Sequence, residues 1–204
     1  MNNLMLDLET LGFNFIVQIG ACYFDIEGNI KEKLLINISI ADSYQKGCQV
    51  DVYELKFWLE NANKITWFNN TIELNKALQL FTEFCNKNKK AKVFSHYYDV
   101  SVLENVCRLL KRKMPFNHRN WRDIRTIVDL SGIKKEKKLL SKCCNAEVIV
   151  QGEVTMYYLC TKCMKPCDVT TSDLKTHNAL EDCIYQVNYL VKAFKSLKNK
   201  GGIR

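Results

Sequence analysis

Two acidic residues near the start of the chain have a spacing that suits a metal site. Asp7 and Glu9 interrupt residues 4–9, a segment that is otherwise apolar and is typical of a buried strand. Residues two apart on a strand point to the same face, so both carboxylates face the same way. Burial of unpaired carboxylates is costly, so we expect a cation to compensate them there. Taken alone, such a pair is more often found at an exposed strand end.

Another acid follows much later in the chain. Asp99 comes just after residues 91–95, a short apolar segment expected to form a buried strand, and it precedes a helical pattern. By itself, an acid at that place is common at the N-terminus of an ordinary helix.

A histidine and an acid flank the start of the last predicted helix. Asn178 and Glu181 have the N-cap and N3 spacing of a capping box. That spacing places His177 just before the helix and Asp182 in its second turn. The imidazole ring can then swing toward the helix face that carries Asp182.

Four carboxylates and one imidazole at one sheet edge would suit phosphodiester chemistry. The carboxylates repel one another, and divalent cations relieve that repulsion. Hard oxygen ligands favour Mg²⁺ or Mn²⁺, and two such ions about 4 Å apart clamp the attacking and leaving oxygens of a phosphodiester. A neutral histidine nearby takes the proton from an attacking water. The acids are Asp7, Glu9, Asp99 and Asp182, and the histidine is His177.

An α/β fold is needed to bring these residues together, and the sequence pattern predicts one. Residues 4–9, 15–24 and 30–40 are predicted to form an antiparallel meander. Helical stripes and short apolar segments then alternate along the chain. The predicted helices are 52–63, 71–86, 100–112, 124–130 and 178–195, and the predicted later strands are 91–95 and 119–122. This order indicates a mixed sheet with helices packed on it.

The composition fits a globular protein rather than a membrane-bound one. The 204 residues are 47% hydrophobic and 25% charged, and no apolar run reaches the roughly 18–20 residues of a membrane span. The N-terminus lacks a basic segment and a cleavage site, so we expect no signal peptide and a cytoplasmic location. A surplus of 30 Lys and Arg over 22 Asp and Glu gives a net charge of +8, which favours an anionic partner such as nucleic acid.

Taken together, these segments resemble the DEDDh branch of the 3′–5′ exonucleases, which have an RNase H-like fold. The family's first motif, Asp-x-Glu-Thr-x-Gly, stands at residues 7–12, and its Ile-Gly-Ala strand stands at 19–21. Asp99 represents the second motif, and residues 177–182 match the third, His-x-Ala-x-x-Asp. The run 121–126 is similar to a bacteriophage-type subgroup.

The resemblance implies a fold, a reaction and a set of roles. The fold would be a mixed five-stranded sheet flanked by helices, built from residues 1–133 and 172–204. The reaction would be hydrolysis from the 3′ end of DNA or RNA, with release of nucleoside 5′-monophosphates. The four acids would hold two Mg²⁺ or Mn²⁺ ions, and His177 would be the general base. The expected substrate contacts are Thr10, Leu11 and Tyr98, although Tyr98 is equally typical of a core aromatic residue.

Several alternatives stay open at this point. A non-catalytic nucleic-acid-binding protein would keep the same scaffold, but the presence of all five site residues favours an enzyme. An enzyme of the same fold would also suit internal cleavage, whereas His177 and the first motif favour trimming at the 3′ end. Asp123 is another candidate acid, and Arg122 and Arg125 flank it as candidate partners. Dimers occur among related enzymes, so a homodimer is an alternative to a monomer.

Half of the ten cysteines crowd into one segment. In a chain without a secretion signal, such clusters are more often metal ligands than disulfides. The clustered residues are Cys143, Cys144, Cys160, Cys163 and Cys167, and the scattered ones, expected in the core, are Cys22, Cys48, Cys85, Cys107 and Cys183.

The spacing within the cluster predicts a zinc ribbon. Cys160-x-x-Cys163 is the spacing of a zinc knuckle, and a hairpin formed by residues 148–150 and 156–159 would join two knuckles. We therefore predict an insert over residues 134–171 that holds one structural Zn²⁺. Cys160 and Cys163 are the strongest candidate ligands, followed by Cys144 and Cys167, with Cys143 as a neighbour.

Overall fold

The computed structural model describes the chain except for residues 1, 134–137, 153–156, 173–176, 200 and 202–204. The chain divides into two compact units. One unit combines Met1–Ile133 with Thr176–Arg204, and the other is Lys134–Lys175.

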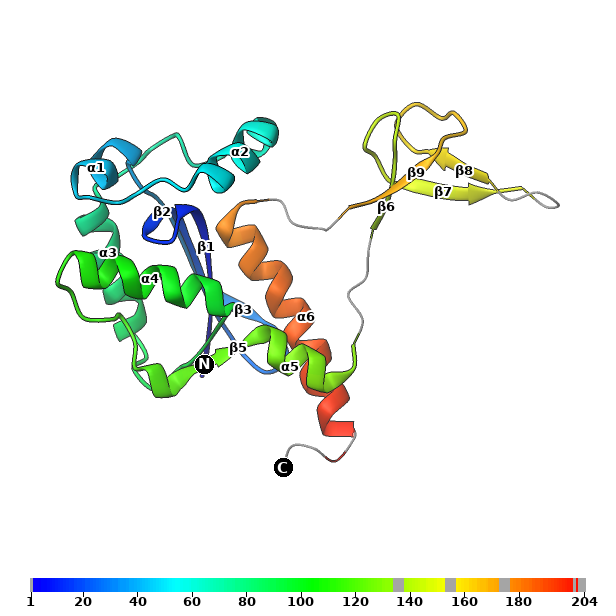
Figure 1. The fold of residues 1–204 in the computed structure, drawn as a ribbon. Coiled ribbons are helices and arrows are strands. Elements are labelled where there is room, and N and C mark those ends of the chain that lie inside the picture. The colour runs from blue at the N-terminus through cyan, green and yellow to red at the C-terminus, as the bar shows by residue number, and fades with distance from the viewer. Residues whose placement is uncertain (1, 134–137, 153–156, 173–176, 200, 202–204) are drawn as a thin grey trace. The chain divides into compact units, whose positions relative to one another are not determined.

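The first unit is built on a mixed five-stranded sheet with the strand order β3-β2-β1-β4-β5 (Figure 1). The strands are β1 (Asn3–Gly12), β2 (Phe15–Phe24), β3 (Ile30–Asn37), β4 (Lys92–Ser95) and β5 (Trp121–Asp123). β1, β2 and β3 form the predicted antiparallel meander, while β4 runs parallel to both β1 and β5. This sheet, flanked by helices, is the predicted RNase H-like α/β fold.

Six helices accompany the sheet among the described residues. They are α1 (Ile40–Gln45), α2 (Val52–Glu60), α3 (Leu74–Asn86), α4 (Tyr97–Leu109), α5 (Ile124–Ser131) and α6 (Ala179–Asn199), with 3-10 turns at Ala62–Lys64 and His118–Asn120. The predictions of α2, α3, α4, α5 and α6 are confirmed, with shifts of a few residues at their ends. α1 was not predicted.

Two boundaries differ from the prediction for local reasons. The third strand ends at Asn37 rather than at residue 40, because Ser39 begins α1 by accepting a hydrogen bond from the Asp42 amide at 3.3 Å. α4 begins at Tyr97, three residues earlier than predicted, so Asp99 lies inside its first turn. Asp99 is therefore held by helical backbone rather than by a loop.

The alternation of β1 separates two cores. Leu4 and Leu6 pack on one face of the sheet in a cluster that includes Leu78 of α3 and Leu103 of α4. Met5, on the other face, packs with residues of α5 and α6. Figure 1 accordingly places α3 and α4 on one side of the sheet and α5 and α6 on the other. Because side chains alternate along a strand, Asp7 and Glu9 share the face of Met5 and α6.

A glycine lets α6 begin close to the sheet. Gly20 of β2 lies opposite Asp7 in the strand register, and a Cβ there would lie 2.2 Å from the carbonyl carbon of Ala179. The buried Gln18 side chain accepts a hydrogen bond from the Ala179 amide at 2.7 Å. Asn178 caps the helix as predicted, and its side-chain oxygen accepts from two amides at 3.2 Å.

The second unit contains two antiparallel strand pairs. β6 (Lys138–Ser141) pairs with β9 (Val169–Ser172), and β7 (Val148–Gln151) pairs with β8 (Tyr157–Cys160). The pair of β7 and β8 is the predicted hairpin. Residue 156, at which its second strand was predicted to begin, lies outside the described residues. The first pair was not predicted, because it joins segments nearly thirty residues apart.

No helix in the described part of the chain is both long enough and apolar enough to span a membrane.

Candidate active site

Three buried carboxylates meet between β1 and α6. Asp7 and Glu9 project from β1 and Asp182 from α6, and one oxygen of each lies within 4.8 Å of the others. Their exposed fractions are 5%, 7% and 3%. Three hard oxygen donors at this spacing form a candidate site for a divalent cation. We call these three residues the acid group.

Asp99 lies outside the acid group but acts on the same part of the core. It is buried in the first turn of α4, where its Oδ2 accepts a hydrogen bond from the His96 amide at 3.3 Å. Burial raises the pKa of the Cys183 thiol well above its usual value, and the charges of Asp7 and Asp99 raise it further. Cys183 directly follows Asp182 of the acid group in the chain.

His177 stands before α6 in a left-handed backbone conformation, with φ at 56°. Its ring packs edge-to-face against two aromatic rings of α2, with centroid distances of 5.1 Å to Phe57 and 5.7 Å to Trp58. A positive φ is uncommon for a residue with a side chain, and such positions cluster at functional sites. His177 is not one of the three residues whose ligand atoms lie within 4.8 Å of one another.

α2 contacts three of the predicted site residues. Trp58 donates its indole N–H to the carbonyl oxygen of Thr10 at 2.8 Å, and its ring also faces His177. Tyr98 donates its hydroxyl to Glu54 at 3.1 Å and lies 3.5 Å from the Thr10 hydroxyl. The sequence did not indicate these contacts of α2, because an apolar stripe at helical spacing predicts a helix and not which residues the helix touches.

The three predicted substrate contacts differ in exposure. Thr10 and Leu11 are buried, whereas Tyr98 is half-buried, and burial raises the pKa of its hydroxyl. The exposed ring of Phe13 meets Tyr98 edge-on at 5.7 Å. Phe13 and Arg108 both line an open groove of about 470 Å³. Of the three, Tyr98 is therefore the one beside an open surface.

Asp123 is used for helix capping. Its carboxylate accepts hydrogen bonds from the amide of Thr126 at 2.9 Å and from the hydroxyl of the same residue at 2.8 Å. It also accepts from the amide of Tyr97 at 3.2 Å. Arg122 donates instead to backbone carbonyl oxygens. This set of contacts accounts for Asp123 as the N-cap of α5.

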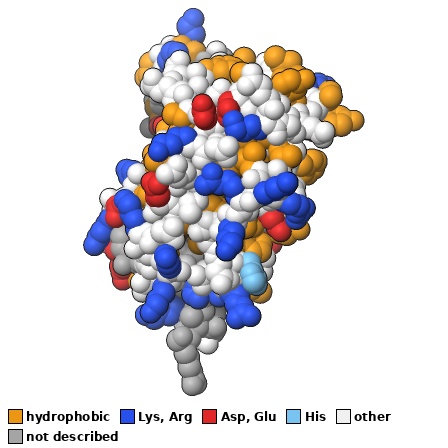
Figure 2. All heavy atoms as spheres, turned by 90° about the vertical axis from the view of Figure 1, so that its left-hand side faces the viewer, with side chains coloured by type: hydrophobic (Ala, Val, Ile, Leu, Met, Phe, Trp, Pro, Cys, Tyr) orange, Lys and Arg blue, Asp and Glu red, His pale blue; other side chains and the backbone are white. Residues whose placement is uncertain are grey.

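Positive charge is widespread on one face of the molecule. Figure 2 shows this face, on which Lys and Arg side chains are more widespread than Asp and Glu side chains. A basic surface attracts polyanions from a distance, whatever their sequence.

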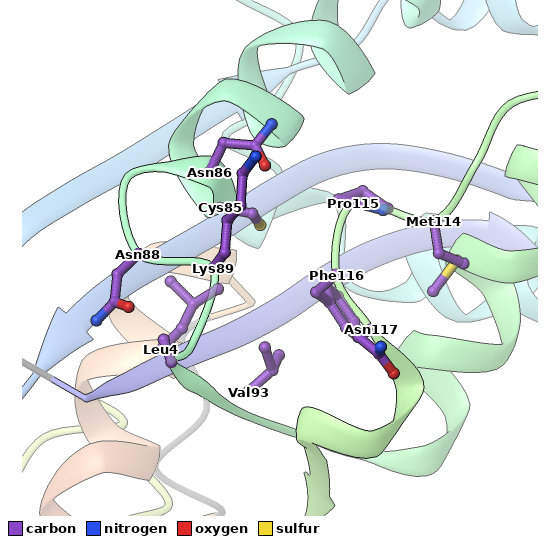
Figure 3. Close-up of a pocket in the computed structure, with 11 residues that line it drawn as sticks. Leu4, Cys85, Asn86, Asn88, Lys89, Val93, Met114, Pro115, Phe116 and Asn117 are labelled. Carbon is purple, nitrogen blue, oxygen red and sulfur yellow. The ribbon is translucent and has the colours of Figure 1, made fainter.

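A separate cavity of about 430 Å³ lies at the other end of the sheet (Figure 3). Lys89 lies on one side and Phe116 and Asn117 on the other, with Val93 of β4 between them. Leu4 and Val93 stand near the starts of their strands, whereas the acid group follows the chain toward the carboxyl end of β1. In α/β sheets, ligands bind outside the carboxyl ends of the strands, so the acid group stands at the expected end.

Four cysteines of the second unit form a compact cluster. The sulfur atoms of Cys143, Cys144, Cys160 and Cys163 all lie within 4.8 Å of one another. We call these four residues the thiol group. It includes Cys143, which the sequence suggested as a neighbour, and does not include Cys167. Burial and the nearby charges of three other cysteines raise the pKa of the Cys167 thiol. Four thiols at this spacing fit a tetrahedral zinc site.

The two loops that carry the thiol group have the same backbone pattern. Asn145 and Met164 both adopt a left-handed conformation, with φ values of 51° and 56°. Matching backbone hydrogen bonds run from Ser141 to Ala146 (2.8 Å), from Cys160 to Lys165 (3.0 Å), from Asn145 to Ser141 (2.8 Å) and from Met164 to Cys160 (2.9 Å). Ser141 therefore occupies in the first loop the place that Cys160 occupies in the second. Its buried hydroxyl donates to the Cys160 sulfur at 3.2 Å. This bond, together with hydrogen bonds from the backbone of Cys163 and Lys162, lowers the pKa of the Cys160 thiol to about 6.

Comparison of the sequence with known protein families identifies the family of this chain. The model of the 3′-5′ exoribonuclease Rv2179c-like domain matches residues 2–147, which is more than half of the chain. A comparison with curated proteins finds no match. The matched segment contains Asp7, Glu9 and Asp99, and it ends before His177 and Asp182. The chain also has a mixed five-stranded sheet, with an acid group beside its central strand β1. Because the family model covers more than half of its length, this chain belongs to the family of Rv2179c-like 3′-5′ exoribonuclease domains.

Proposed function

We propose that this protein is a metal-dependent 3′–5′ exonuclease that releases nucleoside 5′-monophosphates from the 3′ end of a nucleic acid. The observation that carries the proposal is the acid group, in which three buried carboxylates from β1 and α6 lie within 4.8 Å of one another. Membership of an exonuclease family supports the same reaction class.

The donor set fits hard divalent cations. Asp7, Glu9 and Asp182 offer only carboxylate oxygens, which suits Mg²⁺ or Mn²⁺ better than softer metals. Asp99 would complete the set for a second ion. When bound, the paired ions would stabilise the charge that develops on the attacking and leaving oxygens of the phosphodiester.

His177 is the proposed general base. The reaction breaks the bond between phosphorus and the 3′ oxygen of the penultimate nucleotide, and a water oxygen takes its place on phosphorus. The neutral imidazole accepts one proton from that water, and the departing 3′ oxygen takes a proton from solvent. Contacts with Phe57 and Trp58 limit the rotation of the ring.

The surface beside Tyr98 is the proposed path of the substrate strand. Phe13 and Tyr98 supply ring faces on which bases stack, and Arg108 supplies a cation for a phosphate. Thr10 follows Glu9 of the acid group and precedes Phe13 in the sequence. The indole N–H of Trp58 holds its carbonyl oxygen by a hydrogen bond. The family description names exoribonucleases, so we propose RNA as the substrate class to test first.

The experiment follows one strand labelled at either end. With Mg²⁺, a 5′-labelled RNA should shorten progressively and a 3′-labelled RNA should release a labelled mononucleotide at once; EDTA should stop both. Asp7→Asn should abolish hydrolysis while leaving the fold intact. Asp129→Asn, which changes an exposed acid on α5, is the matched control and should keep the full rate.

Other outcomes distinguish the alternatives. Internal fragments from the 5′-labelled strand would indicate an endonuclease, and binding without cleavage would indicate a non-catalytic nucleic-acid-binding protein. A DNA oligomer of the same sequence, run in parallel, decides between DNA and RNA. A full rate for Asp7→Asn would refute the site assignment.

For the second unit, we propose that the thiol group holds one structural Zn²⁺ in a zinc ribbon. The paired loops and the compact cluster support this assignment. Ser141 stands where a first-loop cysteine would, and Cys143, two residues later, would supply the sulfur in its place.

A further inference from the structure

Gln186 lies one helical turn after Asp182 and faces the same strand. Its side-chain amide donates a hydrogen bond from Nε2 to Oδ1 of Asp7 at 2.6 Å. Residues four apart share a helix face, so two successive turns of α6 address the acid group. The side chain is buried, with 5% of its surface exposed.

Packing alone does not account for a glutamine at this position. A carboxylate only accepts hydrogen bonds, so the amide must turn its N–H toward Asp7. That orientation leaves Oε1 buried with no hydrogen-bond partner among the described residues. A buried acceptor without a partner is destabilising. A leucine would fill similar space without that cost.

The chemistry of an amide also differs from that of charged side chains. A lysine or arginine here would neutralise Asp7 and compete with a cation for its oxygens. A glutamate would add one more carboxylate to the acid group and repel it. An amide supplies a donor and no net charge, so it fixes a carboxylate while leaving its negative charge for a metal.

We propose that Gln186 is a positioning residue that holds the carboxylate of Asp7 in the orientation that binds the divalent cation. The bond to Oδ1 restricts rotation of the carboxylate and so fixes its orientation beside Glu9 and Asp182. This inference rests on the proposed function, since it assumes that the acid group binds metal. Residues that hold metal-ligating side chains typically change metal affinity or activity by 10–100-fold when replaced.

The test measures metal binding directly as well as activity. Mn²⁺ binding to the full chain is followed by calorimetry without nucleic acid, and the rate is measured over a range of Mn²⁺ concentrations. Gln186→Leu should weaken Mn²⁺ binding by roughly 10–100-fold and raise the half-saturating Mn²⁺ concentration by a similar factor. At saturating Mn²⁺, the KM for RNA should stay near that of the unmodified protein.

A matched control exists on another helix. Gln79 also donates to a carboxylate, that of Glu83 at 2.8 Å, but on the exposed surface of α3. Gln79→Leu should leave Mn²⁺ binding unchanged. If Gln186→Leu fails to fold, Gln186→Met keeps the unbranched shape and carries the test.

Two failures can be told apart. If the unmodified protein binds Mn²⁺ and hydrolyses RNA while folded Gln186→Leu or Gln186→Met binds Mn²⁺ equally well, the positioning role is wrong and the proposed function stands. If the unmodified protein neither binds Mn²⁺ nor hydrolyses RNA, both proposals fall together.

Discussion

At the scale of single residues, His177 lies outside the acid group, so the two proposed roles rest on different residues. The three buried carboxylates have the geometry of metal ligands, whereas the imidazole packs on α2 outside that group. A base and a metal site built from separate residues can be removed separately.

His177→Ala should therefore slow hydrolysis and spare metal binding. Positioned general bases contribute typically 10²–10⁴-fold, so we expect a rate loss of about that size. Mn²⁺ affinity, measured by calorimetry, should not change. His118→Ala, an exposed histidine in a 3-10 turn, is the control and should keep the rate. A large loss of Mn²⁺ binding in His177→Ala would mean that the histidine is a ligand instead.

Several of these residues could be predicted from the sequence, and others could not. Asp7 and Glu9 share a face because the side chains of a strand alternate, and Asn178 places Asp182 because capping is a local rule. Gln186 gave no such signal. Its partner Asp7 is 179 positions away in the chain, and no spacing rule connects them.

At the scale of elements, the contact between α6 and β2 leaves no room for a side chain at Gly20. Gly20 admits the first turn of α6, and Gln18 accepts a hydrogen bond from the first amide of the helix. The same turn carries Asp182, which the sequence placed in the second turn. The position of one acid therefore depends on the absence of a side chain on a neighbouring strand.

Gly20→Ala should lower stability and activity together. The added methyl carbon would lie 2.2 Å from a backbone carbon and 2.3 Å from a backbone oxygen of Ala179, so the helix itself must move. Overpacking of this kind costs typically about 1–3 kcal/mol of unfolding free energy. Thermal melts and hydrolysis rates measure both effects. A Gly20→Ala protein with normal stability and rate would contradict this account.

The larger elements could be predicted because their patterns are long. The ten-residue strands β1 and β2 are almost wholly buried, and α3 has a clear apolar stripe. α1 has only six residues and one buried side chain, so it shows no periodicity. The pairing of β6 with β9 depends on contacts distant in sequence, which local patterns do not contain.

At the scale of the whole molecule, charge is distributed unevenly between the two units. Residues 134–175 hold eight Lys and five Asp or Glu, a net +3, which leaves +5 of the total +8 for the rest of the chain. A Zn²⁺ with four thiolates adds about −2, so the second unit would carry only about +1. With zinc bound, most of the net positive charge would therefore lie in the first unit.

Replacing two zinc ligands should therefore remove zinc without weakening the electrostatic grip on RNA. Cys160→Ser with Cys163→Ser should abolish the one Zn²⁺ per chain measured by atomic emission, while Cys167→Ser keeps it. RNA affinity is then measured against salt in an Asp7→Asn background, where each lost phosphate contact on a single strand changes the logarithmic slope by about 0.7. We expect the salt slope of the double variant to stay within about 0.7 of that of its parent. Arg108→Gln, which changes a residue of the groove beside Phe13, should reduce the magnitude of the slope by about 0.7. A decrease of about 2 or more in the magnitude of the salt slope of the double variant would correspond to about three lost phosphate contacts. That result would show that the zinc ribbon itself binds the phosphate backbone, although its net charge is small.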